Sequence, residues 1–139
     1  MNKNKVQVVI FTNAGCNKKQ FLLLQMNERR KLHWQNVTGG VEKNETFKDA
    51  ALRESMEETA LEKINIKKMM ASQTSYKFTD QWNNQVLEKV FFIECYSKWD
   101  IQLDPEEHIH FAWISEDKVQ RDSVFYESNY QCLSEAIQI

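Results

Sequence analysis

The sequence predicts a mixed α/β sandwich, in which a sheet of short strands packs against a central helix and a C-terminal helix. Apolar runs rich in β-branched residues lie on both sides of one uninterrupted helical segment in the middle of the chain. The 139 residues include one proline and three glycines, and no Pro/Gly/Ser-rich linker separates two parts of the chain. We therefore expect a single domain over residues 1–139.

The N-terminal part of the chain is expected to form three strands. Residues 5–12 (KVQVVIFT) are rich in β-branched side chains and predict the first strand. Residues 13–19 supply turn residues, and the apolar run over 20–26 predicts a second strand that pairs back on the first. A short third strand is expected over 34–37, ending at Thr38-Gly39-Gly40.

The middle of the chain predicts one helix over residues 46–59 (TFKDAALRESMEET). Its apolar residues keep helical spacing, and it contains neither glycine nor proline. Thr46, with Asp49 three positions later, resembles a capping box in which Asp replaces the usual Glu. The helix is therefore expected to begin at this threonine.

The second half of the chain predicts three more strands and two helices. The strands are expected over 64–76, 85–96 and 109–114, with a hairpin turn at 78–84 between the first two. A short helix is expected over 115–119 and a C-terminal helix over 127–137.

Composition and charge exclude several classes of protein. Hydrophobic residues (42%) and charged residues (27%) occur at the levels of an ordinary globular protein, and the net charge of −2 gives no electrostatic reason to expect a nucleic-acid surface or an anionic membrane as partner. The apolar stretch 6–11 is too short for a signal-peptide core or a membrane span, so we expect a cytoplasmic protein. Cys16, Cys95 and Cys132 are odd in number and form no CxxC pair, which predicts free thiols rather than disulfides or a zinc site.

Three glutamates crowd one face of the predicted helix. Glu54, Glu57 and Glu58 are three and four positions apart, where like charges repel by about 0.2–0.5 kcal/mol per pair. They also lie toward the helix C-terminus, where the helix dipole disfavours anions, and Arg53 alone does not balance them. Oxygen ligands at this density suit Mg²⁺ or Mn²⁺. The alternative is an ordinary solvated helix face.

The loop before the helix adds a second element. Gly39 and Gly40 allow close backbone approach and positive φ, and a carbonyl of this loop could join a metal shell. Glu45 is expected to reach back to Arg53 and hold the loop against the helix. The fixed offsets of these residues from the three glutamates favour a metal site over a solvated face.

Residues 39–61 (GGVEKNETFKDAALRESMEETAL) resemble the Nudix box, Gly-x5-Glu-x7-Arg-Glu-U-x-Glu-Glu-x-Gly-U, where U is a bulky aliphatic residue. The resemblance implies a Nudix-type α/β/α sandwich with a mixed central sheet and a loop-helix catalytic motif. It implies a role for Glu45 and Arg53 in holding that motif in shape. Two positions depart from the pattern: Ser55 occupies the first aliphatic slot, which weakens a packing contact, and Ala60 replaces the last glycine, which alters the helix C-terminus.

The same resemblance implies a Mg²⁺-dependent hydrolase, with Mn²⁺ as a substitute, that directs water onto a phosphorus of a diphosphate. Glu54, Glu57 and Glu58 would bind the metal together with the carbonyl of Gly39. The general base would be Glu54 or Glu107.

A second segment, residues 34–42 (WQNVTGGVE), resembles the WQ-x-VTG-x-VE segment of the dihydroneopterin triphosphate pyrophosphatase branch of the family, which also handles dATP. In that branch the glutamate of an EH-x4-W tract is a metal ligand, and Glu107-His108 with Trp113 matches the tract. This implies that Glu107 completes the metal site. The alternative is an exposed loop acid.

The implied substrate is a small molecule, either a (deoxy)nucleoside triphosphate or a pterin triphosphate, cut to a monophosphate and pyrophosphate. Dinucleoside polyphosphates, nucleotide sugars and ADP-ribose remain alternatives, as does a non-catalytic nucleotide-binding module on the same fold. The clustered acids favour the enzyme. The basic run 29–31 either meets phosphates or forms a solvated loop. Tyr76, Phe78 and Trp82, near the hairpin tip, leave open a platform for a ring or a contact in a homodimer.

Overall fold

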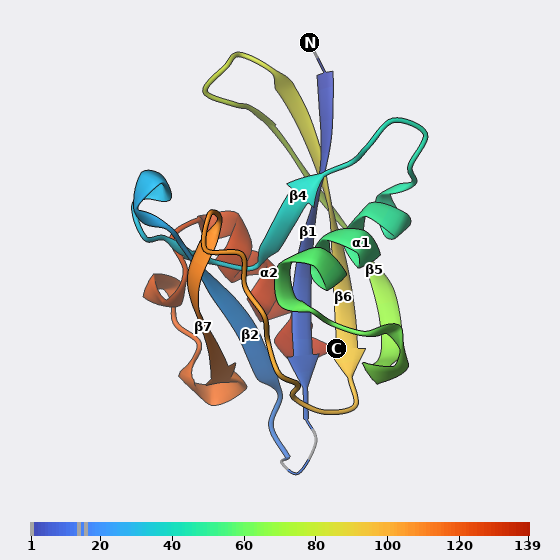
Figure 1. Ribbon diagram of the computed structural model, residues 1–139, viewed down its shortest axis with the longest axis vertical. Coiled ribbons are helices and arrows are strands. Elements are labelled where there is room, and N and C mark those ends of the chain that lie inside the picture. The colour runs from blue at the N-terminus through green and yellow to red at the C-terminus, as the bar shows by residue number, and fades with distance from the viewer. Residues whose placement is uncertain (1, 14, 16) are drawn as a thin grey trace.

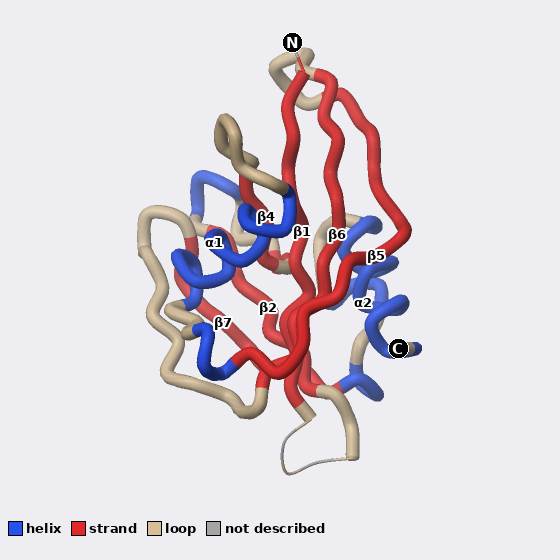
Figure 2. Tube along the Cα trace, turned by 90° about the vertical axis from the view of Figure 1, so that its right-hand side faces the viewer, coloured by secondary structure: helices blue, strands red, loops and turns tan. Residues whose placement is uncertain are grey.

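The fold is a mixed sheet covered by one helix on each face. The computed structural model describes residues 2–13, 15 and 17–139. Helix α1 (Phe47–Thr59) lies in front of the sheet and α2 (Glu127–Gln138) behind it, as Figures 1 and 2 show from two directions. None of the described helices is long and apolar enough to cross a membrane. The strands described are β1 (Asn2–Thr12), β2 (Gln20–Met26), β3 (Trp34–Gln35), β4 (Val37–Gly40), β5 (Ile66–Thr79), β6 (Gln85–Cys95) and β7 (His108–Ser115), and the short 3₁₀ helices are η1 (Glu28–Arg30), η2 (Lys63–Asn65), η3 (Glu116–Lys118) and η4 (Arg121–Ser123).

The predicted α/β/α sandwich with a mixed central sheet is confirmed. Three elements differ. The expected strand over 34–37 is divided at Asn36 into β3 and β4, and Thr38-Gly39-Gly40 belongs to β4 instead of ending the strand. β5 runs on to Thr79, into the turn expected over 78–84, and the short helix expected over 115–119 is the 3₁₀ helix η3. Cys95 and Cys132 are buried free thiols, whereas Cys16 lies outside the described residues.

The sheet opens into a wedge between β1 and β2. These two strands pair only where they meet, at Phe11 with Phe21 and Thr12 with Gln20. Beyond this point β1 pairs in parallel with β6 and antiparallel with β4, whereas β2 pairs with β3 and β7. The predicted pairing of the first two strands is therefore correct only at their junction, and Figure 1 shows the strands diverging from it.

Two apolar cores fill the space between the sheet and the helices. Val6, Val8 and Ile10 of β1 pack on the α1 side, whereas Val9 and Phe11 pack on the α2 side. All five side chains are nearly inaccessible to solvent. The uninterrupted apolar run in β1 follows from this arrangement, because a strand covered on both faces buries every side chain.

The ends of α1 are closed by specific contacts. At its N-terminus the Oγ1 of Thr46 accepts a hydrogen bond from the backbone N–H of Asp49 at 3.0 Å, as the sequence predicts. At its C-terminus Ala60 adopts the left-handed conformation with φ 60°, and its N–H donates to the carbonyl of Met56. Ser55 is fully buried and its hydroxyl donates to the carbonyl of Ala51 at 2.8 Å, so the departure from an aliphatic residue leaves no unpaired polar group.

Candidate metal centre

Arg53 joins the loop after β4 to helix α1. Its Nε lies 2.8 Å from Glu45 Oε2, its Nη2 donates to the carbonyl of Gly40 at 2.8 Å, and its Nη1 lies 2.8 Å from Glu54 Oε1. The hydrogen bond from Arg53 lowers the pKa of Glu45 to about 2, and the same pair raises the pKa of Arg53. The predicted contact between Glu45 and Arg53 is present. Through it and the bond to the Gly40 carbonyl, the guanidinium group of Arg53 holds the loop against the helix.

Position 39 has room only for glycine, because the Glu54 side chain occupies the place of a Cβ. A Cβ at this position would lie 2.1 Å from Cδ and 2.5 Å from Cγ of Glu54, whereas a Cβ at Gly40 would meet nothing within 4 Å. Neither Gly39 nor Gly40 uses the positive φ that glycine allows; of the glycines, Gly15 has that conformation, with φ 71°. The absence of a side chain at Gly39 lets the Glu54 carboxylate lie directly against the backbone of β4.

The three glutamates of α1 lie in different surroundings. Glu58 is buried, with 9% of the residue exposed, and Glu54 is partly buried. Both line one cleft. Glu57 does not line the cleft; 61% of its side chain is exposed, and its Oε2 is 3.3 Å from Arg53 Nη1. The helix thus brings two carboxylates into the cleft, whereas the third is exposed and paired with Arg53.

The loop before β7 brings Glu107 to Glu58, and the first residue of β7 brings His108. One ligand atom from each of these three residues lies within 4.8 Å of the others. The loop is held by the backbone N–H of Asn27, which donates to the Glu107 carbonyl at 3.1 Å. The structure therefore places Glu107 beside the acids of α1. His108 is a member of the cluster that the sequence does not predict as a ligand; its position next to Glu107 at the start of a strand is the signal that could have found it.

The carboxylates in this cluster repel one another. Burial, together with the charges of Glu54 and Glu107, raises the pKa of Glu58 to about 9, and burial also raises the pKa of Glu54. Burial and the nearby Arg30 lower the pKa of His108 to about 4, which leaves a neutral imidazole at physiological pH. Oε2 of Glu58 is buried and has no hydrogen-bond partner among the described residues. A divalent cation fits this set, because it would pair the orphaned oxygen and relieve the carboxylate repulsion.

The cleft has a volume of about 610 Å³ and spans the wedge in the sheet. Gly39 and Gly40 line it from the β1–β4 side, and Met26 and Gln35 line it from the β2–β3 side. Its charged lining residues are Lys5, Arg29, Arg30, Glu54, Glu58, Asp104, Glu106 and Glu107. The cleft therefore carries carboxylates and cations together, in a space large enough for a small phosphorylated molecule.

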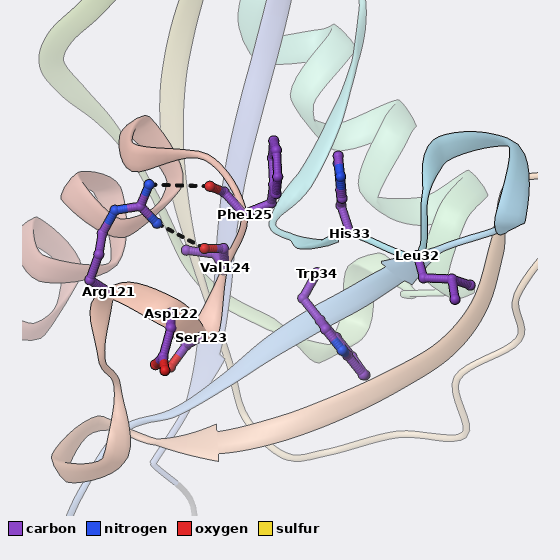
Figure 3. Close-up of a pocket in the computed structure, with 8 residues that line it drawn as sticks. All are labelled: Leu32, His33, Trp34, Arg121, Asp122, Ser123, Val124 and Phe125. Carbon is purple, nitrogen blue, oxygen red and sulfur yellow. Dashed lines mark hydrogen bonds between the residues drawn. The ribbon is translucent and has the colours of Figure 1, made fainter.

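A second cavity of about 390 Å³ lies at β3 and η4 (Figure 3). The rings of His33 and Phe125 stack at 3.5 Å with an interplanar angle of 5°, and Arg121 donates to the carbonyls of Val124 and Phe125 at 2.9 and 3.2 Å. Trp34 lines this cavity, whereas its neighbour Gln35 lines the acid cleft. None of the clustered glutamates contributes to its lining.

Comparison with known families assigns the class. A family model described as NUDIX domain matches residues 1–133, which is nearly the whole chain. The chain therefore belongs to the Nudix family. Nudix enzymes generally use a divalent metal, and the acidic cluster described above can hold one.

Solved structures with the same fold are named for, or hold, different phosphate compounds. The E. coli dihydroneopterin triphosphate pyrophosphohydrolase is 23% identical, with a TM-score of 0.80 over 99% of this chain and 98% of its own. The C. elegans Ap4A hydrolase, solved as a binary complex, is 20% identical, with a TM-score of 0.75 and 98% of each chain covered. The Nudix domain of Shewanella oneidensis NrtR, solved with ADP ribose, is 15% identical, with a TM-score of 0.77 over 99% of this chain and 88% of its own. A comparison with curated proteins found no match.

Proposed function

We propose that the protein is a Mg²⁺-dependent hydrolase that cuts a (deoxy)nucleoside triphosphate or dihydroneopterin triphosphate to the monophosphate and pyrophosphate. The observation that carries the proposal is the buried Glu58, which has an unpaired Oε2 and lies beside Glu107 and His108 in the large cleft. That oxygen has no hydrogen-bond partner among the described residues, and a divalent cation is the partner that its chemistry favours.

The metal would be held by carboxylates of α1 and of the loop before β7. The proposed ligands are the carbonyl of Gly39 and the side chains of Glu54, Glu57, Glu58 and Glu107. Mn²⁺ is expected to substitute for Mg²⁺, because both take hard oxygen ligands. Bound there, the cation would neutralise charge on the substrate phosphates and lower the pKa of a coordinated water.

The remaining steps belong to the protein. Glu54 or Glu107 accepts the proton of the attacking water as general base, and both carboxylates lie in the cleft. Arg53 and Glu45 keep the loop against the helix, so that Glu54 holds its position beside Gly39. These two residues support catalysis through the geometry that they maintain.

The triphosphate is favoured over other phosphate substrates by the segment over residues 34–42, which resembles that of the dihydroneopterin triphosphate branch. Dinucleoside polyphosphates and ADP-ribose are the principal alternatives, since structures with the same fold act on or bind them. A non-catalytic binding module is the least favoured alternative.

The test is a hydrolysis panel with Mg²⁺ on the purified protein, with products identified by mass. The panel holds dihydroneopterin triphosphate, the deoxynucleoside triphosphates, diadenosine tetraphosphate and ADP-ribose. Release of pyrophosphate from a triphosphate supports the proposal, and turnover of only the last two substrates overturns the triphosphate assignment. No turnover with Mg²⁺ or Mn²⁺ would favour the binding module.

The metal assignment is tested separately by Glu58→Gln. Because Glu58 has a strongly raised pKa and is neutral without a cation, the amide should leave the fold intact and reduce Mg²⁺-supported turnover by at least about 100-fold. A near-native rate in the Glu58→Gln variant would show that Glu58 is not a metal ligand.

A further inference from the structure

The carboxylates that line the cleft would repel the phosphates of a polyphosphate substrate. Five carboxylates line it: Glu54, Glu58, Asp104, Glu106 and Glu107. A metal at Glu58 and Glu107 would neutralise part of this charge, but Asp104 and Glu106, in the same loop as Glu107, also line the cleft. A polyphosphate therefore needs protein cations in the same cleft in order to enter and remain there.

Two arginines near the cleft already form hydrogen bonds with groups of the protein. Arg53 is engaged by Glu45, Glu54 and the Gly40 carbonyl. Arg29 donates through Nη2 to the carbonyl of Glu106 at 2.9 Å. Lys5 and Arg30 also line the cleft, and neither forms an ion pair within 4.0 Å with a carboxylate in the part of the chain that the structure describes.

The backbone that carries Arg30 is fixed relative to the acids. In the turn after β2, the N–H of Arg30 donates to the carbonyl of Asn27 at 3.0 Å. Asn27 in turn binds the loop before β7 twice, through its backbone N–H to Glu107 and through its Nδ2 to the carbonyl of Glu106. The turn that bears Arg30 and the loop that bears Glu107 thus form one joined wall.

Lys5 approaches from the other side of the wedge. It lies on β1 directly opposite Gly40 of β4, at the start of the loop that Arg53 fastens to α1. Arg30 belongs to the half of the sheet built on β2, whereas Lys5 belongs to the half built on β1. Together they offer positive charge from both walls of the cleft.

We propose that Arg30 and Lys5 form a phosphate-binding site that holds the substrate phosphates not held by the metal, including those that leave as pyrophosphate. This proposal rests on the proposed function. The planar guanidinium of Arg30 can bind two phosphate oxygens at once, and the ammonium of Lys5 supplies a single compact charge. The basic turn after β2 is thereby a part of the site instead of a solvated loop.

The test measures binding of inorganic pyrophosphate in Mg²⁺ by isothermal titration calorimetry. Arg30→Gln and Lys5→Gln should each weaken binding by about tenfold, the size expected for one charge-assisted hydrogen bond. The matched control is Lys31→Gln, which removes one positive charge from the same turn at a residue that does not line the cleft. The affinity of the substrate-free protein for Mn²⁺ should stay within about twofold in all three variants.

The outcomes separate this inference from the proposed function. If the Arg30 and Lys5 variants bind pyrophosphate as tightly as the Lys31 control, or if the wild-type protein does not bind it, the phosphate site is overturned. Hydrolysis of a triphosphate by the wild-type protein would leave the proposed function standing in that case. If the wild-type protein cleaves nothing in the panel and the two variants still lose affinity, the phosphate site stands and the proposed function fails.

Discussion

At the scale of single residues, Gly39 has the sharpest steric requirement. Gly39→Ala would drive a Cβ into the Glu54 side chain, whose Cδ lies 2.1 Å from that point. We expect kcat/KM to fall by about 100-fold, because a displaced catalytic carboxylate costs on that order, while the melting temperature changes little. The control is Gly40→Ala, where a Cβ meets nothing within 4 Å. Equal losses in both variants would contradict the steric explanation.

The raised pKa of Glu58 predicts that metal binding depends on pH. Its pKa of about 9 means that it carries a proton at pH 7, and a cation binding at its carboxylate must displace that proton. We expect Mg²⁺ binding at pH 7 to release about one proton and the apparent affinity to rise about tenfold per pH unit until the pH approaches 9. Calorimetry in two buffers of different ionisation enthalpy measures the released protons. Binding that releases no proton, and that has the same affinity at pH 6 and pH 8, would contradict the prediction.

The same shift affects the stability of the metal-free protein. A carboxyl whose pKa is raised by folding contributes stability that is present below its unfolded value of 4.5 and is lost as the pH rises through about 9. The metal-free protein should therefore lose stability between pH 5 and pH 9, and Glu58→Gln should lose less of it over the same range. Urea unfolding with a chelator present, at several pH values, provides the measurement. An identical pH dependence in both proteins would assign the loss to other groups.

At the scale of elements, the C-terminus of α1 carries a correctable strain. Ala60 stands at φ 60°, a conformation that costs an L-residue about 1 kcal/mol and glycine almost nothing. Ala60→Gly should therefore stabilise the protein by about 1 kcal/mol, seen as a higher urea midpoint with an unchanged slope. Lys48→Gly, at an exposed position inside the same helix, should destabilise it by a similar amount. A destabilising Ala60→Gly would mean that the methyl group makes a compensating contact.

Most elements could be predicted because their signals are local. The composition and length of the apolar runs predicted the long strands, and helical spacing with Thr46 at the start predicted α1. The division of the third strand at Asn36 could not be predicted, because its cause lies far along the chain. The N–H of Asn36 donates to Oδ1 of Asn129 in α2, and its Nδ2 donates to Oε1 of Gln7 in β1.

The site, like the fold, could be predicted only where its contacts are local in sequence. Spacing within residues 39–61 predicted the contact between Glu45 and Arg53 and the crowding of the glutamates, since both are set by one loop and one helix. Glu107 entered only through a family resemblance. The pairing of β2 with β7 brings it to α1 from about fifty residues away, and no local pattern encodes that step. Asn27 and Arg30 depend on the same pairing and were not assigned to the site.

At the scale of the whole molecule, a buried polar network joins the sheet to α2. Asn36 contacts Gln7 and Asn129, and Gln7 donates to the buried Glu88 at 2.9 Å. Asn36→Ala should cost about 2–3 kcal/mol, because it leaves Gln7 with an unpaired oxygen in a dry environment. Asn4→Ala, at an exposed position of β1, should change the unfolding free energy by less than about 0.5 kcal/mol. Similar values for both variants would show that the network adds no stability beyond its packing.

The parallel ladder between β1 and β6 also constrains how the chain can be made. Asn2 to Phe11 pair with Gln85 to Glu94, so partners are separated by more than eighty residues. On the ribosome β1 must wait for most of the chain before β6 appears, and until then only β4 and the end of β2 can pair with it. An apolar strand left open at one edge during synthesis invites association with other nascent chains. The pause before the ladder closes is thus the period in which a chaperone would have most to protect.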